Sequence, residues 1–96
     1  MTHLEVSGAA REDLARLLFT HKLPSDTGRR LRRSIEHLAS LPLAGRALDG
    51  EWEGYRYVIG PWRWMVVIYR YNEDLDRLIV SAIHDGRSSR AARPLR

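Results

Sequence analysis

Two arginines stand in the most apolar and aromatic stretch of this chain, GYRYVIGPWRWMVVIYRY, which covers residues 54–71. Arg56 and Arg63 fall in two strand-like runs that a break at Gly60–Pro61 separates. Strands joined by so short a connection pair antiparallel, and in that register both guanidinium groups share the open face of a sheet. An anion between them would be held by charge-assisted bidentate bonds, which are roughly twice as strong as neutral hydrogen bonds. The alternative is that both arginines lie over the sheet and pair with this chain's own carboxylates, at Glu51, Glu53 or Asp85.

A second pair of residues that could take part in a reaction is His84 and Arg87. They lie at the end of the last apolar run and beside the Asp85–Gly86 turn. Histidine exchanges a proton near neutral pH, so a histidine beside arginines can act as a general acid or base. The alternative is a histidine at a strand end that bonds to the backbone. The chain has no cysteine and no close histidine pair, so we expect neither a metal site nor a cofactor.

Arginines also dominate the charge of the whole chain. Of its sixteen basic residues fifteen are arginine, the net charge is +4 and the sequence pI is about 10.1. The planar guanidinium fork matches phosphate and carboxylate, so nucleic acid or an acidic protein is the natural class of partner. The candidates for binding nucleic acid are a cluster in the second helix and a tail residue, namely Arg29, Arg30, Arg33 and Arg90. The alternatives are the solvated face of an amphipathic helix and a general bias of the proteome toward arginine.

The elements that must position these residues follow from periodicity. The pattern predicts a short strand over 3–7, a helix over 8–20 and a second helix over about 26–40. After a glycine- and proline-rich connection over 41–54, three β-rich runs follow at 54–60, 62–71 and 77–84. The order β-α-α-β-β-β predicts an α+β fold. We expect an antiparallel four-stranded sheet with an αα-hairpin on one face and the other face open.

The domain organisation is simple. We expect one domain over residues 1–89 and a basic, flexible tail over 90–96. No apolar run approaches the roughly 18 residues that a membrane span requires, and the N-terminus does not read as a targeting segment. With the absence of cysteine, these features favour a cytoplasmic protein.

Four segments, in their order along the chain, resemble the RelE/ParE family of toxins from type II toxin–antitoxin modules. They are AAREDL, LASLPLAGRALDG, GYRYVIGPWRWMVVIYRY and VSAIHDGR, and the resemblance covers roughly residues 3–89. Its most specific part is the pattern Y-R-x-x-x-G-x-x-R, followed by an apolar run and Tyr69. The resemblance implies a small α/β fold, a cognate antitoxin that folds over the toxin, and a toxin–antitoxin hetero-oligomer.

The resemblance also implies a choice between two activities. RelE-like members are ribosome-dependent mRNA interferases, which cut mRNA without a metal when a ribose 2′-hydroxyl attacks the adjacent phosphate. Carried over to this chain, their pattern makes Arg56, Arg63, His84 and Arg87 the catalytic candidates, with Glu53 as a second candidate for proton transfer. ParE-like members instead poison DNA gyrase and have no known hydrolytic site.

The chain departs from the interferase pattern at its end. Several interferases carry a catalytic tyrosine or histidine near the C-terminus, whereas here no tyrosine follows Tyr71 and no histidine follows His84. The ending HDGR is similar to ParE-like endings, while Arg63 is absent from many ParE-like toxins. The leading hypothesis is an mRNA interferase, and the alternatives are a gyrase inhibitor and an inactive homologue that still binds an antitoxin.

Overall fold

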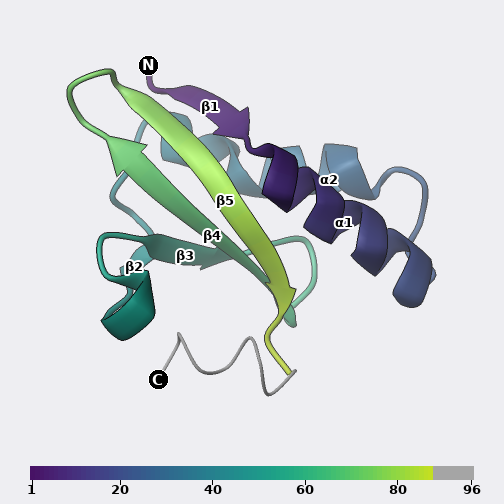
Figure 1. The fold of residues 1–96 in the computed structure, drawn as a ribbon. Helices are drawn as coiled ribbons and strands as arrows, with labels where there is room; N and C mark the ends of the chain where they lie inside the picture. The colour runs from purple at the N-terminus through teal and green to yellow at the C-terminus, as the bar shows by residue number, and fades with distance from the viewer. Residues whose placement is uncertain (88–96) are drawn as a thin grey trace.

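The computed structural model describes residues 1–87 of the chain. Two helices pack on one side of a five-stranded sheet, as Figure 1 shows. The helices are α1 (Gly8–Thr20) and α2 (Thr27–Ile35), and two short 3₁₀ turns are η1 (Glu36–Ala39) and η2 (Gly50–Trp52). The strands are β1 (His3–Val6), β2 (Arg46–Ala47), β3 (Arg56–Ile59), β4 (Met65–Asn72) and β5 (Arg77–Asp85). The predicted α+β class, the order of the main elements and the helical hairpin on one face are confirmed.

The predicted four-stranded antiparallel sheet is wrong in two details. The strand order is β1-β5-β4-β3-β2, and the edge strand β1 runs parallel to β5 while the other pairs are antiparallel. The additional strand β2 comes from the connection that the sequence marked as a loop. Gly50 and Gly54 have φ values of 61° and 90°, a backbone that glycine adopts without steric cost, and they turn this segment back along β3.

Helix α1 is capped by Ser7 at its N-terminus and bonded to the sheet through Asp13. Ser7 caps α1, because its Oγ accepts a hydrogen bond from the Ala10 N–H at 3.1 Å. Strand β1 pairs with β5 only over residues 77–80. Beyond them, Asp13 of α1 covers the edge of β5 and accepts the Ile83 N–H at 3.0 Å. The helix therefore holds the end of β5 where strand pairing has stopped.

Strand β4 is apolar throughout because it has a core on each side. On the helix side, Met65, Val67 and Tyr69 are fully buried beneath residues of both helices. On the other side, Val66 and Ile68 are buried as well, against a smaller cluster formed by Leu48, Trp52, Tyr55, Tyr57 and Ala82. The second face of the sheet is thus covered at β4 by the chain's own 48–57 segment, and the expectation of an open face is wrong there.

No helix within residues 1–87 is long and apolar enough to cross a membrane.

Candidate functional site

Arg56 lies on the helix side of the sheet, so its predicted place on the open face is wrong. It stands opposite Tyr69 in the β3–β4 register, and directly opposed residues project to the same side. Its Nη1 donates to the carbonyl oxygens of Gly45 at 2.8 Å and Leu43 at 3.2 Å. The Arg56 side chain therefore bonds to backbone carbonyls of the 42–45 loop and not to a carboxylate.

Tyr69 secures the same loop from beneath. Its side chain is fully buried, its hydroxyl accepts the Gly45 N–H at 2.8 Å, and it donates to the Pro42 carbonyl at 2.8 Å. Burial raises the pKa of this phenol, which keeps the hydroxyl protonated as a donor. Sequence reasoning missed this role, because nothing local distinguishes Tyr69 from the other tyrosines.

Arg56 and Arg63 do not converge on one anion in this structure. Arg63 lies in the turn between β3 and β4 and is exposed, without an ion pair or side-chain hydrogen bond to any residue in the range 1–87. Arg56 is at the other end of β3, three residues before Ile59. At about 3.3 Å per residue, the length of β3 alone separates the two positions by roughly 10 Å.

The β4–β5 ladder ends between Arg63 and Arg87 in the sequence. Met65 pairs with Asp85, and the Gly86 N–H donates to the Trp64 carbonyl at 2.6 Å, which extends the β4–β5 ladder by one pair. Arg87 follows Gly86 directly, whereas Arg63 lies inside the turn that the Met65 N–H closes on the Trp62 carbonyl at 2.9 Å. A Cβ at Gly86 would meet Val66 Cγ2 at 2.9 Å, so the glycine permits this close approach.

Arg87 is held in place by Asp85 and Trp64. Its Nε and Nη2 donate to the two Asp85 carboxylate oxygens at 3.0 and 2.9 Å, and its guanidinium carbon lies 5.1 Å from the Trp64 ring centroid. His21, at the end of α1, stacks on Trp64 at 4.7 Å, and its Nε2 lies 2.9 Å from Asp85 Oδ2. The Arg87 hydrogen bonds, and after them that of His21, hold the pKa of Asp85 well below its usual range. Sequence reasoning gave His21 no role, and only the fold brings it to Asp85.

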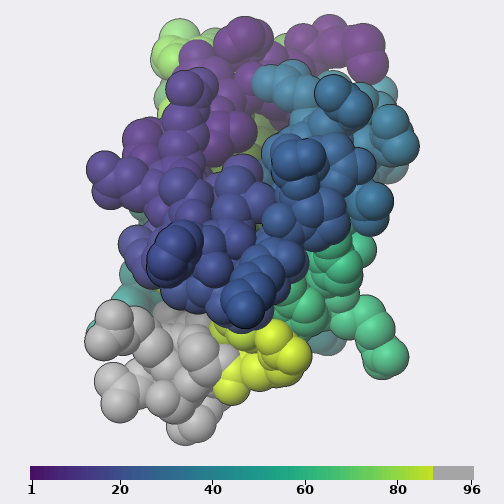
Figure 2. Space-filling view, turned by 90° about the vertical axis from the view of Figure 1, so that its right-hand side faces the viewer, coloured from purple at the N-terminus to yellow at the C-terminus, as the bar shows by residue number. Residues whose placement is uncertain are grey.

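The arginines of α2 join the same end of the molecule. The Arg30 guanidinium lies 5.8 Å from the Trp62 ring centroid, and Trp62 stacks on Trp64 at 6.2 Å. A shallow groove beside them is lined by Asp26, Arg29, Arg30, Arg33, Ser34 and Pro61. We call this region the arginine–tryptophan surface and define it as Arg29, Arg30, Arg33, Trp62, Arg63, Trp64 and Arg87. Figure 2 shows this end, with the end of β5 in yellow below the α1–α2 connection and beside the β3–β4 turn in green.

The charge of this surface is only partly neutralised by acids of the chain. Asp26 pairs with Arg30 at 3.0 Å, and Asp85 pairs with Arg87 at 2.9 Å. Arg29, Arg33 and Arg63 are exposed and have no ion pair within residues 1–87. Five of the eight predicted site residues therefore lie around this end of the molecule, where the described arginines outnumber the acids.

His84 lies close to this surface but on the sheet face away from the helices. It stands opposite Val66, and its ring lies 6.2 Å from that of Trp52, which Glu53 follows directly. The ring is half-buried, and within residues 1–87 it makes no side-chain hydrogen bond. Its ring nitrogens therefore have no side-chain partner in the described part of the chain. The pocket beside it is lined by both histidines of this region, together with Arg16, Thr20 and Asp85.

The sequence also predicted a basic tail and no metal site. Arg90 and the predicted tail over residues 90–96 lie outside the described residues. Within residues 1–87, no three histidine, aspartate or glutamate side chains are grouped as metal ligands.

Neither known family models nor curated proteins match this sequence. Solved structures do match its fold, and several of them are toxins or toxin–antitoxin complexes. The toxin–antitoxin complex RelBE2 from Mycobacterium tuberculosis gives a TM-score of 0.64 at 20% identity, over 88% of this chain and 96% of that one. A copper-bound mutant toxin from Helicobacter pylori gives 0.65 at 22% identity, over 88% and 94%. The DinJ–YafQ toxin–antitoxin complex from E. coli gives 0.59 at 21% identity, over 88% and 92%. These similarities, together with the sheet and the helical hairpin, show that this chain has the RelE-like fold.

Proposed function

We propose that this chain is the toxin of a type II toxin–antitoxin module and that it cleaves mRNA on the ribosome in the cytoplasm. The observation that carries the proposal is the arginine–tryptophan surface at one end of a RelE-like fold. Exposed guanidinium groups bind phosphates through charge-assisted bonds, and this term dominates the affinity of proteins for nucleic acid. A cognate antitoxin is the expected protein partner, in a toxin–antitoxin hetero-oligomer.

The proposed reaction is attack by a ribose 2′-hydroxyl on the adjacent phosphorus, with departure of the 5′-oxygen of the next nucleotide. It requires a base for the hydroxyl proton, an acid for the leaving oxygen and cations for the charge on the phosphorane. Arg63 is exposed and unpaired within the described chain, and Arg87 keeps its Nη1 free while Nε and Nη2 bind Asp85. These two arginines are the proposed cations, and one such donor typically contributes about 2.7–4 kcal/mol to lowering the barrier.

The proton-transfer group is assigned to His84. The ring nitrogens of His21 are both engaged, Nδ1 with Thr20 Oγ1 at 2.8 Å and Nε2 with Asp85, so His21 positions the site instead. Glu53 is the second candidate, because it follows Trp52 in the sequence and the Trp52 ring lies 6.2 Å from that of His84. Arg56, with its Nη1 on the 42–45 loop, is assigned to holding that loop.

One observation favours the second candidate function, a ParE-like inhibitor of DNA gyrase. The catalytic pattern that the resemblance implies pairs Arg56 with Arg63, and here the length of β3 separates them. A binding toxin needs the arginine–tryptophan surface but no convergent catalytic pair.

The test is induced expression in a bacterial host, with mRNA 5′ ends mapped within minutes of induction. For the interferase we expect growth arrest and cuts in translated messages that keep phase with codons. Arg63→Ala should remove the cuts, while Arg46→Ala should keep them, because Arg46 is equally exposed but lies in β2. Arrest with intact messages and DNA breaks would establish the gyrase inhibitor in its place, and no arrest would identify an inactive homologue.

A further inference from the structure

A threonine, a histidine and an aspartate form a continuous hydrogen-bonded chain beside the end of α1. Thr20 Oγ1 lies 2.8 Å from Nδ1 of His21, and Nε2 of His21 lies 2.9 Å from Oδ2 of Asp85. A hydroxyl bonded to an imidazole that a carboxylate orients is the arrangement that activates an oxygen nucleophile. Thr20 ends α1 and Asp85 ends β5, so only the fold assembles the three groups.

The direction of these hydrogen bonds follows from the charge of Asp85. The hydrogen bonds from Arg87 keep the pKa of Asp85 well below its usual range, so this group is a carboxylate and can only accept. The neutral imidazole of His21 therefore carries its hydrogen on Nε2, which donates to Asp85. Nδ1 keeps its lone pair, and the Thr20 hydroxyl donates to it. Stacking on Trp64 at 4.7 Å holds the imidazole in this orientation.

The Thr20 hydroxyl is accessible and has no competing backbone acceptor. Serine and threonine in helices often donate to a carbonyl of the preceding turn, as Ser34 does to Leu31 at 2.7 Å. Thr20 is exposed, and within residues 1–87 its hydroxyl bonds to no carbonyl. An exposed oxygen whose proton is held by a base can attack an electrophile that arrives from solvent.

The pocket beside Thr20 provides apolar walls and a cation. Leu17 and Ile83 line it, and so does Arg16, which lies one turn before Thr20 on the same face of α1. Within residues 1–87 the Arg16 guanidinium bonds only through Nη2, to Asp13 at 3.3 Å. Its other N–H groups can bind an anion. An acyl phosphate matches this pocket, because it joins an apolar acyl group to an anionic leaving group.

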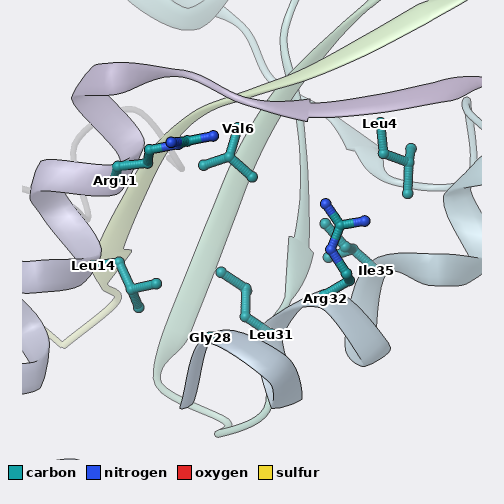
Figure 3. A pocket seen from close by; sticks show the side chains of 8 residues that line it. All are labelled: Leu4, Val6, Arg11, Leu14, Gly28, Leu31, Arg32 and Ile35. Carbon is teal, nitrogen blue, oxygen red and sulfur yellow. The ribbon is translucent and has the colours of Figure 1, made fainter. Parts of the chain in front are cut away.

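The pocket between β1 and the two helices, which Figure 3 shows, provides a comparison. Among the described residues that line it, only Arg11 and Arg32 have polar side chains, so it holds neither a hydroxyl nor an imidazole. Arg11 extends from α1 toward Val6 (Figure 3). It is exposed like Arg16, so the two arginines are matched in type, helix and exposure.

We propose that Thr20 is an acylation site that takes the acyl group of an acyl phosphate. The Thr20 oxygen attacks the carbonyl carbon, its proton passes to Nδ1 of His21, and Arg16 stabilises the oxyanion that forms. The bond from the carbonyl carbon to the phosphate oxygen then breaks. Its electron pair leaves with the phosphate, which takes the proton from His21. The products are an acyl ester of Thr20 and inorganic phosphate.

Two features stabilise the imidazolium of His21 between these steps. Asp85 is ionised and bonded to Nε2, and the carbonyl end of the α1 dipole favours a cation. The acylation goes beyond the proposed function and does not depend on it, since neither a ribosome nor an antitoxin takes part.

The experiment is incubation of the Lys22→Arg chain with acetyl phosphate, followed by intact-mass spectrometry and peptide mapping. Lys22 is the one lysine of the sequence, so this background removes acetylation of lysine side chains. We expect one acetyl group on Thr20, and alkaline hydroxylamine should release it, because hydroxylamine cleaves esters and leaves amides intact. Thr20→Val should abolish the ester, and Thr20→Ser should retain it.

The rate of acetylation tests the other groups. It should fall about tenfold or more in His21→Phe, which keeps a ring against Trp64 but removes the base. In Arg16→Ala it should fall about tenfold, which is less than a buried oxyanion donor contributes, because Arg16 is exposed. Arg11→Ala should leave the rate unchanged, and so should Ser25→Ala, because Ser25 is an exposed hydroxyl without an imidazole partner in the range 1–87.

Three results would overturn the proposal: no ester on Thr20, an unchanged rate in His21→Phe, or acetylation of Ser25 as fast as that of Thr20. Transfer of a phosphoryl group in place of the acetyl group would also overturn it, because the attack would then be on phosphorus. An ester on Thr20 in a chain that fails to arrest growth would leave the acylation site standing and refute the toxin. Growth arrest by a chain that takes no acetyl group would do the opposite.

Discussion

The buried hydroxyl of Tyr69 offers the sharpest test of how this fold holds its long connection. The connection from α2 to β3 contains the segment LPLAG, and two side chains of the sheet bond to it. The Tyr69 hydroxyl bonds both to Gly45 N–H and to Pro42 carbonyl, and Arg56 binds the Gly45 carbonyl. Tyr69→Phe removes one oxygen atom and leaves the ring's packing unchanged.

The magnitude follows from the burial of the two groups that lose their partner. Gly45 is buried, and an unsatisfied buried N–H costs about 1–3 kcal/mol. Pro42 is half-exposed, so its carbonyl can regain water and loses only the net value of one hydrogen bond, about 0.5–1.5 kcal/mol. Together these losses lead us to expect that Tyr69→Phe lowers the free energy of unfolding by about 1.5–4.5 kcal/mol. For a domain of this size each kcal/mol lowers the Tm by about 4–8 °C.

The assay is urea denaturation of the wild type and of Tyr69→Phe at pH 7, followed by a thermal scan of both. Tyr55→Phe is the control, because Tyr55 is half-buried and its hydroxyl bonds to no residue within 1–87; we expect a change below about 0.5 kcal/mol. If Tyr69→Phe were as stable as this control, the hydroxyl would not secure the loop and the reasoning would be refuted.

Three further predictions concern other parts of the fold. Gly45→Ala should lower the free energy of unfolding, measured in urea, by about 1–3 kcal/mol. The reason is that its Cβ would lie 2.5 Å from the Tyr69 hydroxyl and 2.8 Å from the Tyr57 carbonyl. A free energy of unfolding equal to that of the wild type would contradict this close packing. Ser7→Ala should cost about 1 kcal/mol through loss of the α1 cap, and a change below about 0.3 kcal/mol would show that the cap is not needed. The lowered pKa of Asp85 means that its contribution to stability is present above the unfolded value near 4 and is lost as the pH falls. Asp85→Asn should therefore cost about 1–2 kcal/mol at pH 7 and less at pH 3, and a pH-independent difference would argue against the Arg87 and His21 contacts.

The helices and strands could be predicted from the sequence because their signals are local. Period-two alternation in residues 62–71 marks a strand with two apolar faces, and the helical spacing of the apolar residues in the segments before and after Pro24 marks two helices. The parallel pairing of β1 with β5 has no such signal. It depends on which edge of the sheet the first strand reaches. That is decided by contacts between residues far apart in the sequence.

The candidate site was likewise predictable only in part. Arginine type and number predicted an anion-binding surface; Arg29, Arg30, Arg33, Arg63 and Arg87 lie around one end of the molecule, and anion binding there stays a prediction. The partner of each arginine was not predictable. Arg56 was expected beside Arg63, but β3 carries it to the far end of the strand and to the side of Tyr69.

What the sequence by itself determined is the two helices, the four main strands, their order and an excess of guanidinium groups. The tertiary structure alone decided which groups meet: His21 with Asp85, which are 64 residues apart, and Gly45 with Tyr69, which are 24 apart. The physical reason is that secondary structure follows from interactions between near neighbours along the chain. A site is instead made by strand register and helix packing, which bring distant residues together only when the whole core has formed.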